Sequence, residues 1–546
     1  MTTHTLRFHR LARAAAALCV APLASPAAYA AEACHVNGGG ASPAGCMATT
    51  TWAGTGQYEP SIITVVSGGQ YTQPGSGLTI TNANTSAPAG NSGTRGIYAY
   101  GQSIAPVPTP SIADIAGDVS IRVTATNVFN PTSNEGVYAS TGALISIGGG
   151  LRVATSTSNP AYDAQAVVAI GMGVGAMATT ASRVLVGGAL DADTTQAAQT
   201  DFAVEAADGG QITVGNGGAI RSARSGLYVR TGAGGVVSSF SSTGAALLSV
   251  QAGGNGVTME GTSNGNAGTV QLANAAITAN DSGVRLHNNA TSSTLLYRQS
   301  AGSITSTQGS AMAFTGGIGT ATVDLIDTAV STTLPAPGGA DPDGLAMGYA
   351  VVSTSAANNR LHMNGGSITG PIAIETGASL WLDTAGTVWN AAGNPASANT
   401  NSMTGMSGTL TIQMPDILDR IDLEGNTPSL GAGCGTASVT LVVPTNQPAP
   451  PASPHMVMQC KNAAAAPTVV LQGGSVVLGG FVYTLQTSAA DGRVAYNLVR
   501  GAEVPPQPPG AGGVTSVPTL SQWGVMLLSA LSALLGLGAL QSRRRG

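Results

Sequence analysis

Short stretches of this chain place apolar residues at every second position directly after a glycine. One set reads GIYA, GVYA, GLYV, GVTM and GVRL and begins at Gly96, Gly136, Gly226, Gly256 and Gly283. A second set reads GDVSI, GLRV, GQITV, GTVQL and GTLTI and begins at Gly117, Gly150, Gly210, Gly268 and Gly408. Such alternation predicts β-strands with one buried face, and we interpret the glycines as turns between strands.

The phrases recur at irregular intervals of roughly 25 to 40 residues, which is typical of repeat architectures with variable loops. Proline-containing stretches at residues 106–110 and 335–339 would be such loops. Because one strand cannot bury its apolar face alone, stacked coils would share a continuous core. The sequence therefore predicts an all-β, right-handed parallel β-helix, a rod with about 20 residues per coil from about residue 48 to about residue 500. The alternative is a string of β-sandwich domains, but their buried tryptophan and cysteine spacing are missing.

Composition excludes several classes of protein. Charged residues make up 8% of the chain, Lys461 is the single lysine and the formal net charge is −5. Nucleic-acid binding is excluded, because it needs a basic patch and the arginines of the exported part are scattered singly. Valine, isoleucine and leucine are spread along the chain, which argues against disorder. No helical pattern occurs before residue 520.

Four of the five cysteines fall into two local pairs: Cys34 with Cys46, and Cys434 with Cys460. An even number of cysteines in an exported chain favours disulfides, and local pairing closes shorter loops than either crossed pairing would. A metal site is the competing interpretation, but only His35 and His455 lie nearby and no C-x-x-C spacing occurs. We expect two local disulfides, no metal and no cofactor.

The first 30 residues have the pattern of a signal peptide. Three arginines precede an apolar stretch at residues 14–23, and an Ala-Tyr-Ala sequence ends at Ala30. Signal peptidase recognises such a small-x-small pattern, so cleavage after Ala30 and export through the Sec translocon are expected. The alternative is an N-terminal membrane anchor, for which the apolar stretch is too short.

Residues 517–546 combine a short motif, an apolar stretch and a basic end. The apolar stretch covers residues 525–540 and predicts a transmembrane helix, which Trp523 would anchor at the membrane interface. Positive residues remain on the cytoplasmic side, so the basic end would stop transfer. The motif is Val517, Pro518, Thr519, Leu520, Ser521, Gln522, Trp523 and Gly524, and the basic end is Arg543, Arg544 and Arg545.

This tail resembles the IPTL-CTERM signal of Gram-negative bacteria, with Val517 in place of isoleucine and Gln522 in place of an acidic residue. The resemblance implies a partner, an exosortase-like membrane sorting protease. It also implies an intermediate at the inner membrane, followed by a location at the cell surface or outside the cell. The alternative is a plain C-terminal membrane anchor, for which a helix and an arginine cluster suffice.

Residues 361–503 resemble the closing coils of pertactin-like autotransporter passengers, on the stretches 419–425, 474–485 and 492–498. The resemblance implies a cap that ends the β-helix and promotes its folding, preceded by irregular coils over residues 31–360. There are two departures. Ala495 and Tyr496 stand where an aromatic pair is common. A linker rich in proline and glycine at residues 504–516 and then the tail follow where the family has a membrane β-barrel.

Candidate catalytic patterns are weak. Ser263 lies in a G-x-S-x-G pattern at residues 261–265, but roughly one chance match is expected in a chain this rich in glycine and serine. Residues 90–93 are similar to the serine-protease loop of some autotransporters, but Asn91 occupies the place of aspartate. The glycines at 171–175 lack the helix of a dinucleotide-binding loop.

A polysaccharide-cleaving β-helix would place carboxylates from adjacent coils around a glycosidic bond. Asp324 and Asp327 would point to opposite faces of an extended strand. Asp341 with Asp343, and Asp191 with Asp193, would each share a face, but both pairs lie in turn-like sequence. Lyase chemistry would need clustered charges, which the sparse charge disfavours.

We therefore expect a non-enzymatic, exported surface rod. Its role would be adhesin-like or structural, and a glycan or host-surface ligand would be its partner. The alternative is a polysaccharide-degrading or polysaccharide-binding β-helix protein.

Overall fold

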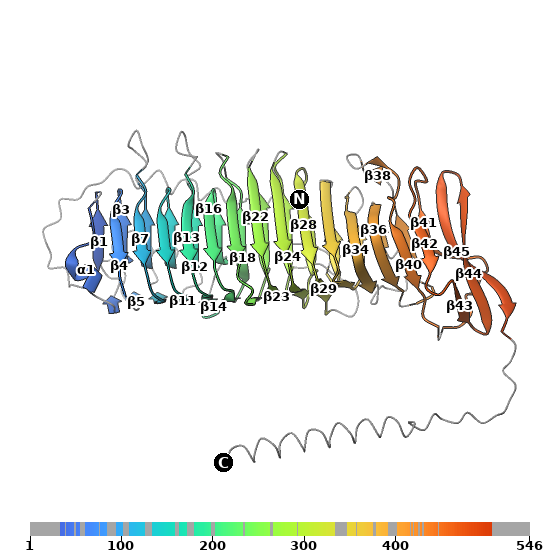
Figure 1. Cartoon of the computed structure of the whole chain (residues 1–546), viewed down its shortest axis with the longest axis horizontal. Coiled ribbons are helices and arrows are strands. Elements are labelled where there is room, and N and C mark those ends of the chain that lie inside the picture. Colours follow the sequence, from blue (N-terminus) through green and yellow to red (C-terminus); the bar gives the residue numbers. More distant parts are fainter. Residues whose placement is uncertain are drawn as a thin grey trace, which may run out of the picture.

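The computed structural model describes residues 33–504 except 39, 49–50, 55–60, 76, 85–93, 102–108, 126–133, 159–162, 172–179, 198–201, 233–234, 263–265, 292, 334–346, 356–357, 375–377, 391–400, 404, 415, 419, 424–425, 428–430 and 446. The described residues form one elongated stack of strands. It runs from the short helix α1 (Ala44–Ala48) at one end to an antiparallel sheet at the other (Figure 1).

The coils contribute strands to three parallel faces, which we call faces A, B and C. Face A is a 12-stranded sheet of β1 (Cys34–Asn37), β3 (Ser61–Val66), β6 (Arg95–Tyr100), β9 (Asn134–Ser140), β12 (Ala164–Ile170), β15 (Phe202–Ala207), β18 (Ser225–Arg230), β21 (Val257–Gly261), β24 (Val284–Asn288), β27 (Met312–Thr315), β30 (Val351–Ser353) and β33 (Ile372–Ile374).

Faces B and C belong to one 25-stranded sheet. Face B contains β4 (Gln70–Gln73), β7 (Ile112–Ile115), β10 (Leu144–Ile147), β13 (Ser182–Val186), β16 (Gly210–Val214), β19 (Ser238–Ser242), β22 (Ala267–Leu272), β25 (Thr294–Gln299), β28 (Thr320–Ile326) and β31 (Asn358–Asn364).

Face C contains β2 (Thr51–Gly54), β5 (Leu78–Asn84), β8 (Val119–Ala125), β11 (Leu151–Thr157), β14 (Leu190–Thr194), β17 (Gly218–Ser222), β20 (Leu248–Ala252), β23 (Ala275–Ala279), β26 (Gly302–Ser306), β29 (Thr328–Thr332) and β32 (Ser367–Thr369). The longer strands β34 (Trp381–Asn390) and β36 (Gly405–Gln413) span faces B and C, and face C continues in β40 (Ser438–Val442) and β42 (Thr468–Leu471).

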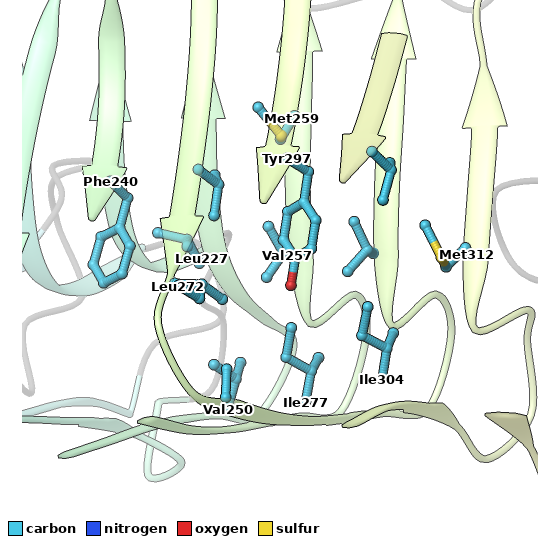
Figure 2. Close-up of a cluster of buried hydrophobic side chains, with 14 of the residues drawn as sticks. Leu227, Phe240, Val250, Val257, Met259, Leu272, Ile277, Tyr297, Ile304 and Met312 are labelled. Atoms are coloured by element: carbon cyan, nitrogen blue, oxygen red, sulfur yellow. The ribbon is translucent and has the colours of Figure 1, made fainter. Parts of the chain in front are cut away.

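The core consists of columns of apolar side chains that stack in register from coil to coil. On face C, Val250 pairs with Ile277, which pairs with Ile304, and all three are fully buried. Figure 2 shows these residues facing the columns of the other two faces, which include Phe240 and Tyr297. Each coil buries its apolar side against its neighbours, as the alternating sequence predicted, so an isolated coil would have no core. Parallel pairing between coils also excludes the sandwich alternative, because sandwich sheets are antiparallel.

Coils are longer than the sequence suggested. Register partners on adjacent coils are as far apart in the chain as Gln70 and Ile112, which are 42 positions apart, and in the last coils they approach 20, as with Arg360 and Trp381, which are 21 apart. The difference arises because each coil holds three strands together with the connections between them. The right-handed sense of the coil remains a prediction.

The two sets of glycine phrases divide between the faces. Every member of the first set leads into a strand of face A, whereas the second set leads into strands of faces B and C. Our interpretation of these glycines as turns is wrong for five of them, which lie inside strands: Gly96, Gly136, Gly226, Gly268 and Gly408. A Cβ added at Gly136 would lie 2.1 Å from Cγ1 of Val153 on face C and 2.7 Å from the carbonyl oxygen of Ala166 in the next coil. The first set therefore lets face A pack closely against face C.

The stack ends in strands of changed direction. β35 (Asn401–Met403), β37 (Ile421–Leu423) and β41 (His455–Cys460) pair in parallel. β45 (Arg493–Glu503) then pairs antiparallel with β41 and β44 (Phe481–Ala490), and β43 (Ser475–Leu478) completes the sheet. β38 (Asn426–Thr427) and β39 (Gly431–Ala432) form a separate small hairpin. The expected cap at 361–503 thus contains both the last parallel coils and this antiparallel sheet.

Within the described range, no helix is long and apolar enough to cross a membrane. The expected transmembrane helix at residues 525–540, the signal peptide at 1–30 with its cleavage at Ala30, and most of the linker lie outside the described residues.

Candidate functional site

A cluster of charged and aromatic side chains lies on the outer side of face B. The backbone register places Arg298 of β25 beside Asp324 of β28, Asp324 beside His362 of β31, and His362 beside Asp383 of β34. In the neighbouring column, Arg360 pairs with Trp381, and Trp381 pairs with Gly405 of β36. We call Arg298, Asp324, Arg360, His362, Trp381 and Asp383 the face B ladder.

Asp383 is the centre of the ladder. Its Oδ2 atom lies 2.9 Å from Nδ1 of His362 and 3.8 Å from Nε of Arg360. Its Oδ1 atom accepts a hydrogen bond of 2.9 Å from the indole nitrogen of Trp381. One carboxylate therefore orients an imidazole, a guanidinium and an indole that come from two adjacent coils.

Trp381 lies against the sheet surface because its neighbour in the next coil is a glycine. A Cβ added at Gly405 would come within 2.2 Å of Cζ3 of the indole. The indole nitrogen also donates a 3.2 Å hydrogen bond to Oγ of Ser407 on the same strand as Gly405. With one side of the ring on backbone and its nitrogen bonded to two acceptors, the partly exposed indole has a fixed orientation.

The other end of the ladder is a second ion pair. Nε of Arg298 lies 2.9 Å from Oδ2 of Asp324, and the two side chains are 52% and 31% exposed. The exposed side chain of Ile326, on the same strand as Asp324, adds an apolar element beside the charges. The ladder is thus an open surface that combines planar polar groups with an aromatic ring and an apolar side chain.

Sequence reasoning found only Asp324 of this cluster. Asp324 faces outward on β28, whereas Asp327 lies beyond the strand end in a left-handed backbone conformation with φ of 43°, so the expectation that the two point to opposite faces of one strand does not apply. The remaining ladder residues come from other coils, with Arg298 and Asp324 already 26 positions apart. A repeat with variable connections gives no spacing rule from which this pairing could be found.

The other carboxylate pairs have different outcomes. Asp191 and Asp193 do not lie in a turn: both belong to β14 of face C and point outward on the same side. The expectation failed because strand pairing between coils outweighs the local turn preference of aspartate. Asp341, Asp343, Ser263, Asn91 and most of the 171–175 glycine stretch lie outside the described residues.

A second group of polar side chains is buried on the outer side of face A. Nε of Arg95 lies 2.9 Å from Oε2 of Glu135 in the next coil, and the guanidinium carbon lies 4.9 Å and 4.8 Å from the ring centres of Tyr98 and Tyr138. Burial alone would lower the pKa of Arg95, but attraction to Glu135 and both phenols raises it, so the guanidinium stays charged. This cluster links two coils, and its buried side chains offer little surface to a ligand.

Further along face A, Phe202 stacks on Tyr228 with 3.9 Å between ring centres. The hydroxyl of Tyr228 donates to Glu260 of the following coil, and Arg230 forms an ion pair with Asp208. Burial, and then the Glu260 carboxylate, raises the pKa of Tyr228 well above its ordinary value. Face A therefore buries its few charges in bonds between coils, in contrast to the open ladder on face B.

Buried tyrosines predict sensitivity to alkali. Burial raises the pKa of Tyr71, Tyr98 and Tyr496 to about 12, against about 10 in an unfolded chain. The folded state favours the neutral phenols, so their contribution is complete below about pH 10 and is lost as the pH rises toward 12. We expect the free energy of unfolding to fall across this window in denaturant titrations, with tyrosinate absorbance measured in parallel. Tyr71→Phe should make the fall less steep, and a constant stability up to pH 12 would contradict this assignment.

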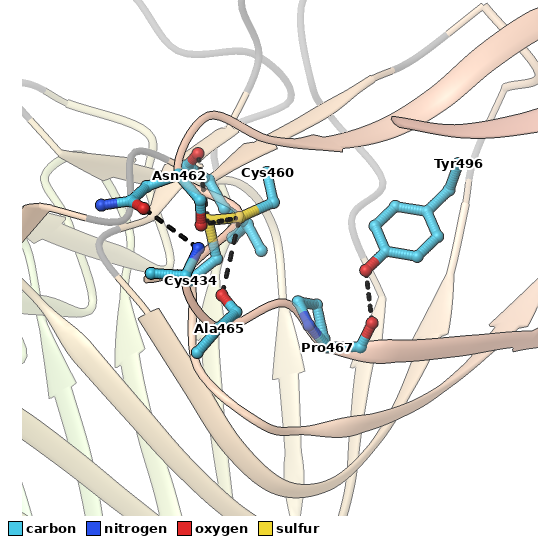
Figure 3. The surroundings of a disulfide bond; sticks show 8 residues. Cys434, Cys460, Asn462, Ala465, Pro467 and Tyr496 are labelled. Carbon is cyan, nitrogen blue, oxygen red and sulfur yellow. Dashed lines mark hydrogen bonds between the residues drawn. A yellow bond between two sulfur atoms is a disulfide. The ribbon is translucent and has the colours of Figure 1, made fainter. Parts of the chain in front are cut away.

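Both local cysteine pairs are disulfides, with Cα atoms 5.7 Å apart in Cys34–Cys46 and 5.8 Å apart in Cys434–Cys460. The first joins β1 to α1 at the start of the stack, and the second lies near its end, beside the antiparallel sheet (Figure 3). Nearby, the Tyr496 hydroxyl of β45 donates to the carbonyl oxygen of Pro467. Because these sulfurs are bonded to each other, they are not available as the metal ligands of the competing interpretation. His455, one of the two histidines of that interpretation, has its Nε2 atom 2.7 Å from the carbonyl oxygen of Ile417.

These features define a parallel β-solenoid with an open polar ladder on one face. Residues 515–545 match the model of the IPTL-CTERM motif, which covers the expected sorting motif, the apolar stretch and the arginines. The motif indicates a protein exported to the cell surface and processed by an exosortase-like system. No curated protein sequence matches the chain.

Proposed function

We propose that this protein is a non-enzymatic surface rod with an adhesin-like or structural role. The observation that carries the proposal is the IPTL-CTERM match directly after a long parallel β-stack. Most of the buried apolar side chains of the stack belong to one continuous core. The outward positions of several strands, such as β16, β19, β20 and β32, are Ser, Thr or Gln, which suits display in water and contact with glycans or host proteins.

The route follows from the tail and the leader. The signal peptide at residues 1–30 directs the chain to the Sec translocon and is removed after Ala30. The helix at 525–540 then holds the passenger at the inner membrane of a Gram-negative cell, with Arg543 to Arg545 inside. The exosortase-like protease cleaves near the 517–524 motif and frees the rod for the surface.

The pertactin-like resemblance supports the passenger role. In that resemblance the closing region caps the β-helix, and here parallel coils give way to antiparallel strands β43 to β45. An antiparallel end covers the last coil, whose open edge would otherwise pair with other chains.

Surface labelling tests the proposal. Intact cells that produce the full chain should bind an antibody against the rod, and cells that produce a chain lacking 517–546 should retain the rod in the periplasm. If the role is adhesive, cells that display the rod should also attach to glycan-coated or matrix-coated surfaces. If the role is structural, these cells should attach no better than cells without the rod on their surface. A full chain that stays in the periplasm would refute surface display.

A second candidate function, polysaccharide cleavage, is favoured by one observation. The face B ladder holds Asp324 and Asp383 on one face with His362 between them in register. Both carboxylates are engaged by partners, which argues for a structural task. Incubation of the purified protein with polygalacturonate should release no new reducing ends. If reducing ends appear and Asp324→Asn abolishes them, the non-enzymatic proposal is wrong.

A further inference from the structure

We infer that the face B ladder is a binding site for acidic oligosaccharides, chains of pyranose sugars that carry carboxylates, a step that rests on the surface role proposed above. Three features of the ladder support this inference. An aromatic ring has a fixed orientation, two guanidinium groups have terminal nitrogens available to a ligand, and the distance between these groups suits a chain of sugars.

The aromatic ring is the indole of Trp381. Because Gly405 has no side chain, one side of the indole rests on the Gly405 backbone, and the side chain of Trp381 stays partly exposed. The apolar C–H side of a pyranose ring packs on the electron-rich face of an aromatic ring, and indole offers the largest such face. The bonds to Asp383 and Ser407 hold the ring in place before any ligand arrives. A ligand therefore need not supply the ordering cost of this side chain.

The guanidinium groups decide the charge of the ligand. Arg298 and Arg360 each use Nε toward a ladder carboxylate, at 2.9 Å and 3.8 Å, and are 52% and 37% exposed. Among the described residues no acceptor contacts their terminal nitrogens, so pairs of N–H donors remain for a ligand. A guanidinium binds a carboxylate through two parallel hydrogen bonds. Asp324 and Asp383 are meanwhile engaged with Arg298, His362 and Trp381, so the outward groups that remain are mainly donors.

The spacing suits a chain of sugars. Arg360 and Trp381 are register partners on adjacent strands, so a ring on Trp381 brings its carboxylate beside Arg360. β25 lies two strands from β31, so Arg298 is about 10 Å further along the rod at about 4.8 Å per strand. That distance is on the order of two sugar units. Arg298 is in register with His362, two residues to the side of Arg360, so an acidic chain that runs obliquely along the rod meets a second guanidinium.

Calorimetric titration of the purified full-length protein tests the inference. Hexagalacturonate is the acidic probe and maltohexaose is the neutral probe of similar linkage. We expect hexagalacturonate to bind at least about tenfold more tightly than maltohexaose. Trp381→Ala should weaken hexagalacturonate binding by about tenfold or more, and Trp381→Phe should retain most of it. Arg360→Gln should weaken hexagalacturonate binding by at least about fivefold.

The matched control is Arg122→Gln, which removes an exposed arginine of face C and should leave hexagalacturonate affinity within about twofold. An equal loss in Arg122→Gln and Arg360→Gln would mean non-specific charge attraction and overturn the site. Equal affinity for both probes would overturn the preference for acidic sugars. Each variant is compared with the parent by circular dichroism and thermal unfolding, so misfolding is recognised. A rod that is displayed on cells but binds neither probe refutes this site and leaves surface display intact.

Discussion

Gly136→Ala should lower the free energy of unfolding by about 2 to 3 kcal/mol, although glycine-to-alanine changes at unstrained sites usually stabilise a protein slightly. The added Cβ would lie 2.1 Å from Cγ1 of Val153 and 2.7 Å from the carbonyl oxygen of Ala166. The first neighbour is a fully buried, stiff side chain, and the second is backbone held by the stack, so neither can move cheaply. Denaturant titration of the purified protein measures the effect.

Gly317→Ala is the control, because a Cβ there would have no neighbour within 4 Å. It should leave the unfolding midpoint unchanged or raise it slightly. The double variant Gly136→Ala with Val153→Ala removes the side-chain contact but keeps the carbonyl contact, so the two changes should be less than additive. If Gly136→Ala is as neutral as Gly317→Ala, close packing of face A against face C is not the reason for glycine at this position.

The strand pattern was predictable from the sequence because every coil must bury one apolar face of each strand. The alternating phrases after glycine predicted buried columns, and Val250, Ile277 and Ile304 form such a column. Even the difference between the two phrase sets carried information, because one set belongs to face A and the other to faces B and C. What the pattern did not reveal was the reason for the difference, since the demand for a glycine at Gly136 comes from Val153 on another face.

The candidate site was harder to predict, because it is assembled across coils. Arg298, Asp324 and Asp383 are isolated charges in the sequence, each in an ordinary alternating strand. They become neighbours only once the length of every connection between coils is known. Strand pairing was also unknown for Asp191 and Asp193, so we expected both in a turn. In the structure they belong to β14, which pairs with both β11 and β17.

Replacement of the motif residues Pro518, Thr519 and Leu520 by alanine should almost abolish release of the rod from the inner membrane. The expected reason is loss of the extended segment that a sorting protease binds, since proline keeps the residue before it out of a helix. The apolar stretch at 525–540 and the arginines would be unchanged, so the uncleaved chain should remain anchored in the inner membrane. Fractionation of the cell envelope followed by immunoblotting measures the shift.

Two comparisons separate sorting from simple anchoring. Alanine replacement of Pro505 and Pro506 in the linker is the matched control and should leave release unchanged, because these residues precede the IPTL-CTERM match at 515–545. Deletion of 525–540 should release the rod into the periplasm without sorting, because nothing then holds it for the protease. Mass spectrometry of the surface protein gives the deciding result. A new C-terminus between Pro518 and Trp523 is expected from cleavage, whereas a C-terminus still at Gly546 means that the tail is an anchor and the sorting route is wrong.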